Sequence, residues 1–399
     1  MSQNALSDTQ PVPAPALLET AKAFFEECWE KPAHFAAVAP GRVNLIGEHV
    51  DYNGGWVLPA AIERHLVLAL RARDDGRIRL RAKDFEGETS FALGEHTPGA
   101  VKGWGRYVQG VIAGLTEAGV EVPGFDAIVV SNLPIGGGLS SSAALEAATA
   151  LGVLALAGRE MDRWTLSKLC QAAEHRYAGV PCGIMDQASI LNCRAGHLLF
   201  LDCAEETFTH APFEASDWAL MIINSKVAHE LAGGEYAQRR AACEAAARTL
   251  GVESLRAVAA AGLDDALALP ELDERMRRCV RHVVTENART HRTVEALAAG
   301  DMAAAGRELN ASHASLRDDY LVSCRELDFI AATAQALDGV AGCRMTGGGF
   351  GGSAIALVRR DRVEDVEQQL AAAYTAEFGF APGIFLTAPA AGAAVYAVG

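Results

Sequence analysis

The feature that most constrains the fold of this chain is a run of glycines and serines between an apolar segment and an alanine-rich one. The run lies within residues 133–148 (LPIGGGLSSSAALEAA). Residues 126–132 (DAIVVSN) favour a strand, and residues 143–157, which are rich in alanine and leucine and lack proline, favour a helix. Glycines let backbone N–H groups approach a ligand, and a helix N-terminus leaves such groups without partners. The pattern predicts either an anion site, with a nucleotide phosphate as the expected anion, or a plain helix cap.

The same run differs from a Walker A loop, which ends in Gly-Lys-Ser or Gly-Lys-Thr. No lysine occurs between Lys102 and Lys168. The charge of a bound phosphate would therefore have to be balanced by the helix dipole, by a metal ion or by an arginine from elsewhere in the chain.

A second cluster, residues 35–60, combines an apolar run with many polar side chains. Glycines interrupt it, which indicates loop and short strands instead of helix. Its polar residues are Arg42, Asn44, Glu48, His49, Asp51, Tyr52 and Asn53. Because they alternate with residues that favour burial, such as Leu45, Ile46 and Trp56, we favour a binding site over a solvated surface loop.

A third cluster, residues 345–352 (MTGGGFGG), contains the spacing G-x-G-x-x-G. A dinucleotide-binding fingerprint follows a strand and opens a helix, whereas here a predicted strand, residues 353–358, comes after the glycines. The alternative is a tight hairpin turn, but the glycines exceed what a hairpin needs. We therefore predict that Gly347, Gly348 and Gly349 form one wall of a ligand site.

A short loop, residues 179–189 (GVPCGIMDQAS), places Asp186 among apolar neighbours. Such a carboxylate either caps the following helix or takes part in proton transfer, and the local sequence alone favours the cap. The preceding residues 165–178 form a predicted helix that carries Glu174, His175 and Arg176.

The remaining segments give expectations about secondary structure. Residues 65–73 and 77–83 alternate in polarity and flank Asp74-Asp75-Gly76, which predicts a β-hairpin. Predicted helices of the second half span residues 236–250, 271–297, 302–309 and 325–336, and a last strand spans residues 394–398.

Composition excludes several classes of protein and partner. A length of 399 residues allows two or three domains, and a net charge of −15 without a basic block argues against nucleic acids and anionic membranes as partners. The nine cysteines show no C-x-x-C and no zinc-type spacing, which favours free thiols in a reducing compartment. The first residues do not resemble a signal peptide, and no apolar run could span a bilayer. We expect a cytoplasmic protein.

The three clusters together resemble galactokinases of the GHMP kinase superfamily. They are PGRVNLIGEHVDYNGG (residues 40–55), LPIGGGLSSSAALE (133–146) and MTGGGFGG (345–352). Further matching stretches are PCGIMDQ (181–187), HELAGGEYAQRRAACE (229–244) and NASHASLRDDYLVSC (310–324). The resemblance extends over nearly the whole chain. The second and third clusters are shared by the superfamily, and the GEH-x-DYN core of the first is the part specific to galactokinases.

The resemblance implies an α+β fold of two domains, with mixed and antiparallel sheets and an active site in the cleft between the domains. The expected parts are a disordered tail (1–15), an N-terminal domain (16–210) and a C-terminal domain (211–399) whose last strand would return to the N-terminal one. The implied reaction is transfer of a phosphoryl group from ATP to the C1 hydroxyl of α-D-galactose, with Mg²⁺ as cofactor. The implied partners are the sugar and ATP alone, and the implied state is a monomer, with a weak dimer as alternative.

Two other functions stay open at this point. One is a related GHMP sugar kinase that acts on N-acetylgalactosamine or arabinose. The other is a non-catalytic protein that senses galactose and ATP and binds a transcriptional regulator. Damage in the serine run or at the carboxylate would favour the sensor, and neither is damaged here.

The resemblance also implies a role for individual residues. Asp186 matches the catalytic carboxylate beside the sugar's C1 hydroxyl and Arg42 matches the basic residue next to it, which replaces the capping interpretation of Asp186. Ser142 and Glu174 match the positions that hold Mg²⁺. The sugar-binding positions match Glu48, His49, Asp51, Gly183 and Tyr236. The ATP-binding loop matches Gly136, Gly137, Gly138, Leu139, Ser140, Ser141, Ser142 and Ala143.

Overall fold

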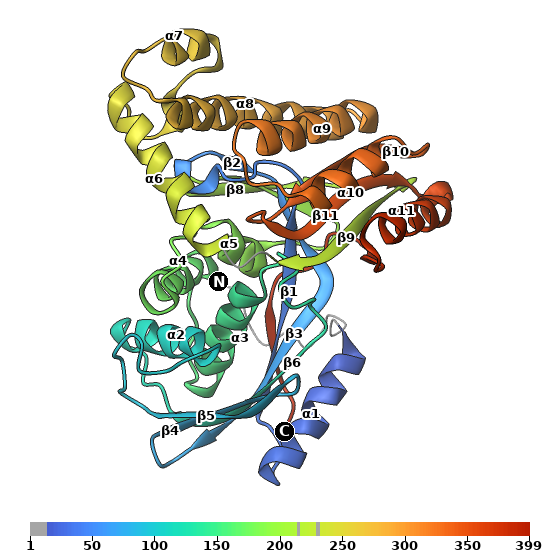
Figure 1. Cartoon of the computed structure of the whole chain (residues 1–399). Coiled ribbons are helices and arrows are strands. Elements are labelled where there is room, and N and C mark those ends of the chain that lie inside the picture. The colour runs from blue at the N-terminus through green and yellow to red at the C-terminus, as the bar shows by residue number, and fades with distance from the viewer. Residues whose placement is uncertain (1–13, 214–215, 229–231) are drawn as a thin grey trace.

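The computed structural model describes residues 14–213, 216–228 and 232–399. Figure 1 shows two lobes, the lower one formed mainly by the first half of the chain and the upper one mainly by the second half. Most of the expected tail at residues 1–15 lies outside the described residues, and so do residues 229–231 of the matching stretch 229–244.

The lower lobe contains a six-stranded sheet in which only the β4–β6 pair is parallel. The order of its strands is β13 (Ala394–Ala397), β1 (Phe35–Asn44), β3 (Pro59–Arg73), β6 (Gly124–Ser131), β4 (Arg77–Ala82) and β5 (Phe85–Ala92). The last strand of the chain therefore pairs with the first one. The predicted hairpin between residues 65–73 and 77–83 is wrong, because β6 lies between β3 and β4.

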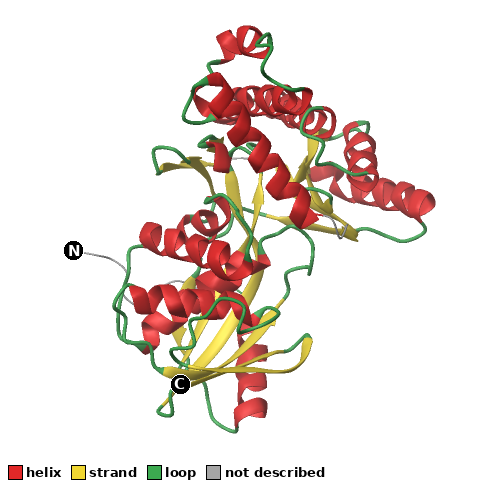
Figure 2. Cartoon of the chain, turned by 60° about the vertical axis from the view of Figure 1, so that its left-hand side comes forward, coloured by secondary structure: helices red, strands yellow, loops and turns green. Residues whose placement is uncertain are grey.

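Both faces of this sheet are covered, and the alternation of β3 explains how. Val67 and Ala69 belong to the apolar cluster under α1, whereas Leu66, Leu68 and Leu70 belong to the main core on the opposite face. Successive side chains of a strand point to opposite faces, so a strand buried on both sides is apolar throughout. The helices of this lobe are α1 (Pro15–Trp29), α2 (Gly105–Glu117), α3 (Ser141–Leu156), α4 (Arg163–Ala173) and α5 (Met185–Asn192). Figure 2 shows this sheet, in yellow, between helices.

The upper lobe contains an antiparallel four-stranded sheet and a set of helices. The sheet has the order β10 (Val340–Thr346), β11 (Gly351–Arg359), β9 (Trp218–Ala228) and β12 (Gly383–Thr387). The helices are α6 (Ala232–Leu250), α7 (Leu263–Leu267), α8 (Glu274–Ala298), α9 (Met302–Asp318), α10 (Arg325–Gln335) and α11 (Val363–Phe378). A small third sheet consists of β2 (Trp56–Val57), β7 (His197–Asp202) and β8 (Thr207–Pro212).

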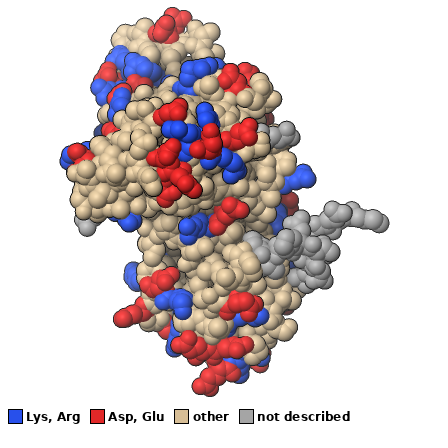
Figure 3. All heavy atoms as spheres, turned by 90° about the vertical axis from the view of Figure 1, so that its right-hand side faces the viewer, with Lys and Arg blue, Asp and Glu red and all other residues tan. Residues whose placement is uncertain are grey.

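Short helical turns complete the chain, and two of them contribute to the site. They are the 3₁₀ turn η1 (Asp51–Asn53) and the π-helical turn η2 (Glu174–Ala178), which continues α4. The others are η3 (Leu255–Ala257), η4 (Ala260–Gly262) and η5 (Arg360–Arg362). No described helix is long and apolar enough to cross a membrane. On the face drawn in Figure 3, basic and acidic side chains are interspersed.

Candidate active site

A bulge in β1 carries Arg42 to the glycine–serine turn. The pairing of β1 with β3 shifts between Pro40 and Arg42. A Cβ at Gly41 would lie 2.8 Å from the carbonyl oxygen of Leu139, and the N–H of Arg42 donates to the same oxygen at 3.1 Å. Bulges re-aim side chains next to functional sites, and this one fixes Arg42 against the turn.

Arg42, Ser140 and Asp186 meet beneath the turn. Arg42 Nε donates to Asp186 Oδ1 at 2.7 Å, and Ser140 Oγ donates to Asp186 Oδ2 at 2.5 Å. Arg42 also donates through Nη1 to the Gly138 carbonyl at 2.6 Å. Burial lowers the pKa of Arg42, but the Asp186 and Glu48 carboxylates outweigh that effect and raise it. Both oxygens of Asp186 have partners, yet its side chain is 24% exposed, so it can still contact a ligand.

The structure does not show Asp186 as a helix cap. Helix α5 begins beside it at Met185, and its N-cap residue Ile184 makes no capping hydrogen bond through its side chain. The carboxylate is instead held by the two side chains described above.

The N-terminus of α3 is open to an anion. Gly136, Gly138 and Ser140 all have positive φ, and the N-cap residue Ser140 makes no capping hydrogen bond, since its hydroxyl points to Asp186. The first N–H groups of α3 thus have no side-chain cap and face the exposed turn. The local geometry suits the predicted phosphate site.

The two glycine clusters touch although they are far apart in the sequence. A Cβ at Gly347 would lie 2.8 Å from the Gly138 carbonyl oxygen, and Ser353 Oγ donates to the Gly137 carbonyl at 2.7 Å. Gly347 and Gly349 have positive φ. A side chain at Gly347 would push the turn and the third cluster apart, and one at Gly349 would meet the Val322 carbonyl at 2.1 Å.

Ser142 and Glu174, the two residues predicted to hold a metal, are adjacent and joined by a hydrogen bond. Glu174 lies in η2, and hydrogen bonds from Cys182, Ser142 and Gln187 favour its ionised form, while burial and the Asp186 charge raise its pKa. The described residues contain no group of three or more His, Cys, Asp or Glu that could hold a metal alone. One carboxylate with one hydroxyl fits Mg²⁺, which also takes oxygens from substrate phosphates. A cation here would offset the repulsion between Glu174 and Asp186.

Asp51 and Gly183 are in tight contact. A Cβ at Gly183 would lie 1.9 Å from Asp51 Oδ2, so any other residue here would displace the Asp51 carboxylate. Asp51 Oδ1 accepts the N–H of Tyr52 at 2.9 Å, and burial, with the nearby Asp186 carboxylate, raises the pKa of Asp51 to about 6. The Tyr236 ring from α6 stands 5.3 Å from the Tyr52 ring. Asp51, Gly183 and Tyr236 therefore bring a carboxylate, backbone and a phenol to one place.

Glu48 is mostly engaged by the protein. It is 1% exposed, and its Oε1 accepts the N–H of Gly347 at 2.8 Å. Its Oε2 accepts from Asn44 Nδ2 at 3.0 Å and pairs with Arg344. A carboxylate has about four acceptor positions, so at most one remains for a sugar hydroxyl.

His49 links the second cluster to the third. Burial lowers the pKa of His49 to about 3, so its ring is neutral. Nε2 lies 3.1 Å from the Gly348 carbonyl oxygen, which can only accept, so Nε2 carries the proton. Nδ1 then accepts from Tyr52 OH at 2.9 Å. Both ring nitrogens have protein partners.

Residues of the upper lobe that belong to none of the sequence motifs hold the second cluster in place. Glu286 on α8 accepts the N–H groups of Gly47 and Glu48 at 3.1 and 3.4 Å, and His282 contacts the Glu48 carbonyl at 3.0 Å. Burial raises the pKa of Glu286, but His282 and nearby arginines lower it to about 2. Arg344 reaches the Leu45 carbonyl at 3.0 Å. The available signal was polar residues on the buried face of a predicted helix.

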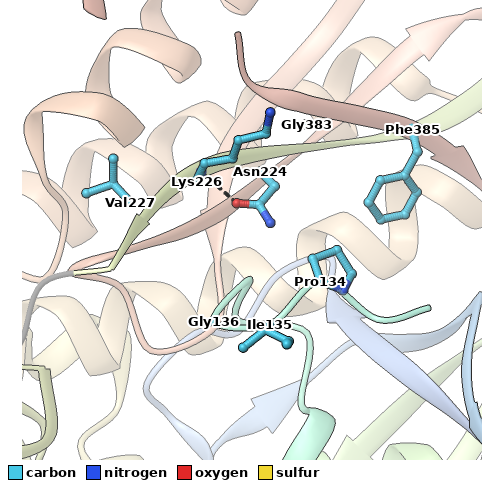
Figure 4. Close-up of a pocket in the computed structure, with 8 residues that line it drawn as sticks. All are labelled: Pro134, Ile135, Gly136, Asn224, Lys226, Val227, Gly383 and Phe385. Carbon is cyan, nitrogen blue, oxygen red and sulfur yellow. Dashed lines mark hydrogen bonds between the residues drawn. The ribbon is translucent and has the colours of Figure 1, made fainter. Parts of the chain in front are cut away.

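A cavity of about 350 Å³ lies beside the start of the turn (Figure 4). Its lining residues are Pro134, Ile135, Gly136, Asn224, Lys226, Val227, Gly383 and Phe385. Asn224 Oδ1 accepts the N–H of Lys226 at 2.7 Å. Of the predicted site residues only Gly136 lines this cavity, so it flanks the turn and does not contain the Arg42–Asp186 pair.

Comparisons with known proteins identify the family of the chain. Three family models match: the galactokinase galactose-binding signature at residues 22–72, the GHMP kinases N terminal domain at 106–193 and the GHMP kinases C terminal at 293–376. The galactokinase of Streptomyces coelicolor is 45% identical over 372 residues, 92% of this chain and 96% of that protein. The human galactokinase is 45% identical over 88% of this chain and 90% of its own length.

Solved structures indicate the same family and show the fold. The crystal structure of Lactococcus lactis galactokinase complexed with galactose has a TM-score of 0.90 and 35% identity, covering 94% of this chain and 99% of that one. A crystal structure of mevalonate kinase, at 19% identity and a TM-score of 0.63, shares the fold alone. The fold is the two-domain α+β fold of GHMP kinases, and the chain belongs to the galactokinase family.

Proposed function

We propose that the protein transfers the γ-phosphoryl group of ATP to the C1 hydroxyl of α-D-galactose, giving galactose 1-phosphate and ADP. The observation that carries the proposal is the position of Asp186. Its carboxylate, held by Arg42 and Ser140, lies where the galactose-signature segment, the glycine–serine turn and α5 meet.

In the proposed reaction Asp186 accepts or orients the proton of the C1 hydroxyl as O1 attacks the phosphoryl group. Arg42 pairs with Asp186 and adds positive charge near the transferring group. Ser140 donates to the other carboxylate oxygen, which limits the rotation of Asp186. Chemistry of this kind depends mainly on position and electrostatics.

The proposed nucleotide site is the turn of residues 136–143 and the N-terminus of α3. Backbone N–H groups there supply donors in place of the absent Walker lysine. Ser142 and Glu174 are the residues that would hold Mg²⁺, which supplies positive charge to the phosphates when bound. Gly347, Gly348 and Gly349 would close this side of the site.

The proposed sugar site has two kinds of residue. Asp51, Gly183 and Tyr236 would contact the sugar directly, with Asp51 as the main acceptor. Glu48 and His49 would chiefly hold the sugar segment against the glycine wall, because most of their polar positions already have protein partners. A site made of directed hydrogen bonds penalises an epimer that leaves a buried group unpaired.

The experiment that tests this proposal is an ADP-release assay with galactose, glucose and N-acetylgalactosamine side by side. We expect turnover with galactose and at least 100-fold lower kcat/KM with glucose, the size of effect expected when a site built to hydrogen-bond a hydroxyl meets its absence. Preference for N-acetylgalactosamine would indicate a related sugar kinase. Tight binding of galactose and ATP without ADP release would indicate a sensor.

We also propose a monomer in the cytoplasm. All nine cysteines are free thiols in the structure, which is typical of a reducing compartment. Light scattering at micromolar concentration should give the mass of one chain, and a stable dimer would contradict this part.

A further inference from the structure

Gln187 follows Asp186 in the first turn of α5 and is fully buried. Its Nε2 lies 2.6 Å from Glu174 Oε2 and 3.1 Å from Glu146 Oε2. A primary amide nitrogen carries two hydrogens, so both are used. The amide nitrogen is therefore fixed between two carboxyl groups.

The groups around Gln187 come from separate helices. Ser142 and Glu146 are four residues apart on α3 and so share one of its faces. Glu174 belongs to η2, a π-helical turn, a feature frequent at functional sites. Cys182 is a second donor to Glu174 Oε2, at 3.4 Å. Ser142 also donates to Glu174, but Gln187 and Cys182 both act on Oε2, so neither of them occupies Oε1.

Holding the Gln187 amide between these carboxyl groups costs free energy. Gln187 Oε1 and Glu146 Oε1 are buried without hydrogen-bond partners among the described residues. An apolar side chain of the same length would remove the unpartnered Gln187 oxygen, but it would also withdraw the donor from Glu146 Oε2 and Glu174 Oε2, and buried polar atoms without partners are unfavourable. The feature that an apolar residue could not supply is the N–H group directed at Glu174.

We propose that Gln187 is a positioning residue for the metal carboxylate. It fixes Oε2 of Glu174 so that Oε1 faces the cation together with Ser142. It also ties Glu174 to the helical turn that carries Asp186. The carboxylates of Glu174 and Asp186 therefore keep a fixed distance and orientation. The inference rests on the proposed function, in which Ser142 and Glu174 hold the cation.

The test is Gln187→Met, which keeps the length of the side chain and removes the donor. Mn²⁺ is titrated into protein with the non-hydrolysable analogue AMP-PNP, and free Mn²⁺ is read by electron paramagnetic resonance. We expect Mn²⁺ binding to weaken roughly 10- to 100-fold, the usual effect of losing a residue that orients a metal ligand. Binding of galactose, measured separately by calorimetry, should stay within about twofold.

Gln109→Met is the matched control. Gln109 is also fully buried, and its Nε2 donates to the carbonyls of Glu95 and Thr97 at 2.6 and 3.4 Å. The Gln109→Met variant should leave Mn²⁺ binding unchanged, even if it lowers the free energy of unfolding. A loss equal to that of Gln187→Met would overturn the inference, because the effect would then be general to buried glutamines.

Gln187→Asn is the second variant if Gln187→Met does not fold. It keeps a buried amide but withdraws the donor by one methylene, and an Mn²⁺ affinity at least threefold below wild type is expected. Unchanged Mn²⁺ binding in the variant that folds overturns the role of Gln187 and leaves the proposed function intact. Absence of metal-dependent AMP-PNP binding in the wild type overturns the metal assignment and this inference together.

Discussion

Two arginine–carboxylate pairs lie close to each other around the second cluster, and they differ mainly in exposure. In the Arg42–Asp186 pair the side chains are 5% and 24% exposed, whereas in the Arg344–Glu48 pair they are 0% and 2% exposed. Arg42 belongs to the lower lobe and Arg344 to β10 of the upper lobe. The same type of ion pair therefore has two roles in the second cluster. The Arg42–Asp186 pair presents an accessible carboxylate, and the Arg344–Glu48 pair is a buried link between the lobes.

The difference follows from desolvation. Burial raises the pKa of Glu48, and Arg344 and Arg42 act against this shift. A sealed pair gains little net free energy, but losing one partner leaves a charge without compensation. The accessible pair keeps a face for a ligand, so its loss should affect turnover more than folding. Each prediction below tests one side of this contrast.

The largest effect is expected from Arg344→Met, which leaves Glu48 unpaired in a dry site. Urea unfolding should show a loss of about 3–5 kcal/mol. The control is Arg292→Met, because Arg292 pairs with Glu308 at side-chain exposures of 51% and 21% and should cost no more than about 1 kcal/mol. Equal losses in the two variants would mean that the Arg344–Glu48 pair is not a structural link.

Gly183→Ala should have a smaller and more local effect. The new methyl group would displace Asp51, with a cost of about 1–3 kcal/mol for overpacking. Galactose binding should weaken roughly 10- to 100-fold, while the KM for ATP stays within about twofold. Gly262→Ala, at a position with open space, should change neither value. Normal galactose affinity in Gly183→Ala would remove Asp51 from the sugar site.

The smallest effect concerns pH. Asp51 has a raised pKa of about 6 against an ordinary value of 3.8, so its contribution to stability is present below pH 3.8 and lost as pH rises through 6. Sugar binding should show the opposite trend, because an ionised carboxylate accepts a hydrogen bond from a hydroxyl more strongly than a protonated carboxyl does. Galactose affinity should fall up to about tenfold per pH unit below pH 6. Asp51→Asn should bind weakly at every pH, and an unchanged pH profile in that variant would assign the titration to another group.

Local signals of the sequence located much of this fold. The glycine–serine run, with an apolar segment before it and alanines after it, placed the helix start within two residues of Ser141, where α3 begins. The periodicity predicts helix α9 only to residue 309, yet the helix continues to Asp318. Asn310, Ser312 and His313 are weak helix formers, and tertiary contacts compensate for this.

Partners that meet only in three dimensions were beyond the reach of the sequence. The alternation of residues 65–73 and 77–83 correctly predicts strands, but β6 enters between them from far along the chain. Glu286 and Arg344 lie within regular elements outside every motif, and nothing local marks them as contacts of Gly47 and Glu48. The pattern of apolar residues in the sequence indicates which residues are buried, whereas the contacts that each of them makes are known only from the structure.

The central claim is that Asp186, and not the sealed carboxylate, prepares the sugar oxygen for transfer. The most direct measurement compares Asp186→Asn with the wild type for ADP release and for binding of AMP-PNP and galactose. We predict a loss of turnover of about 10²- to 10⁴-fold, with both ligands still bound and the free energy of unfolding changed by less than about 2 kcal/mol. Turnover within tenfold of the wild type would contradict the claim.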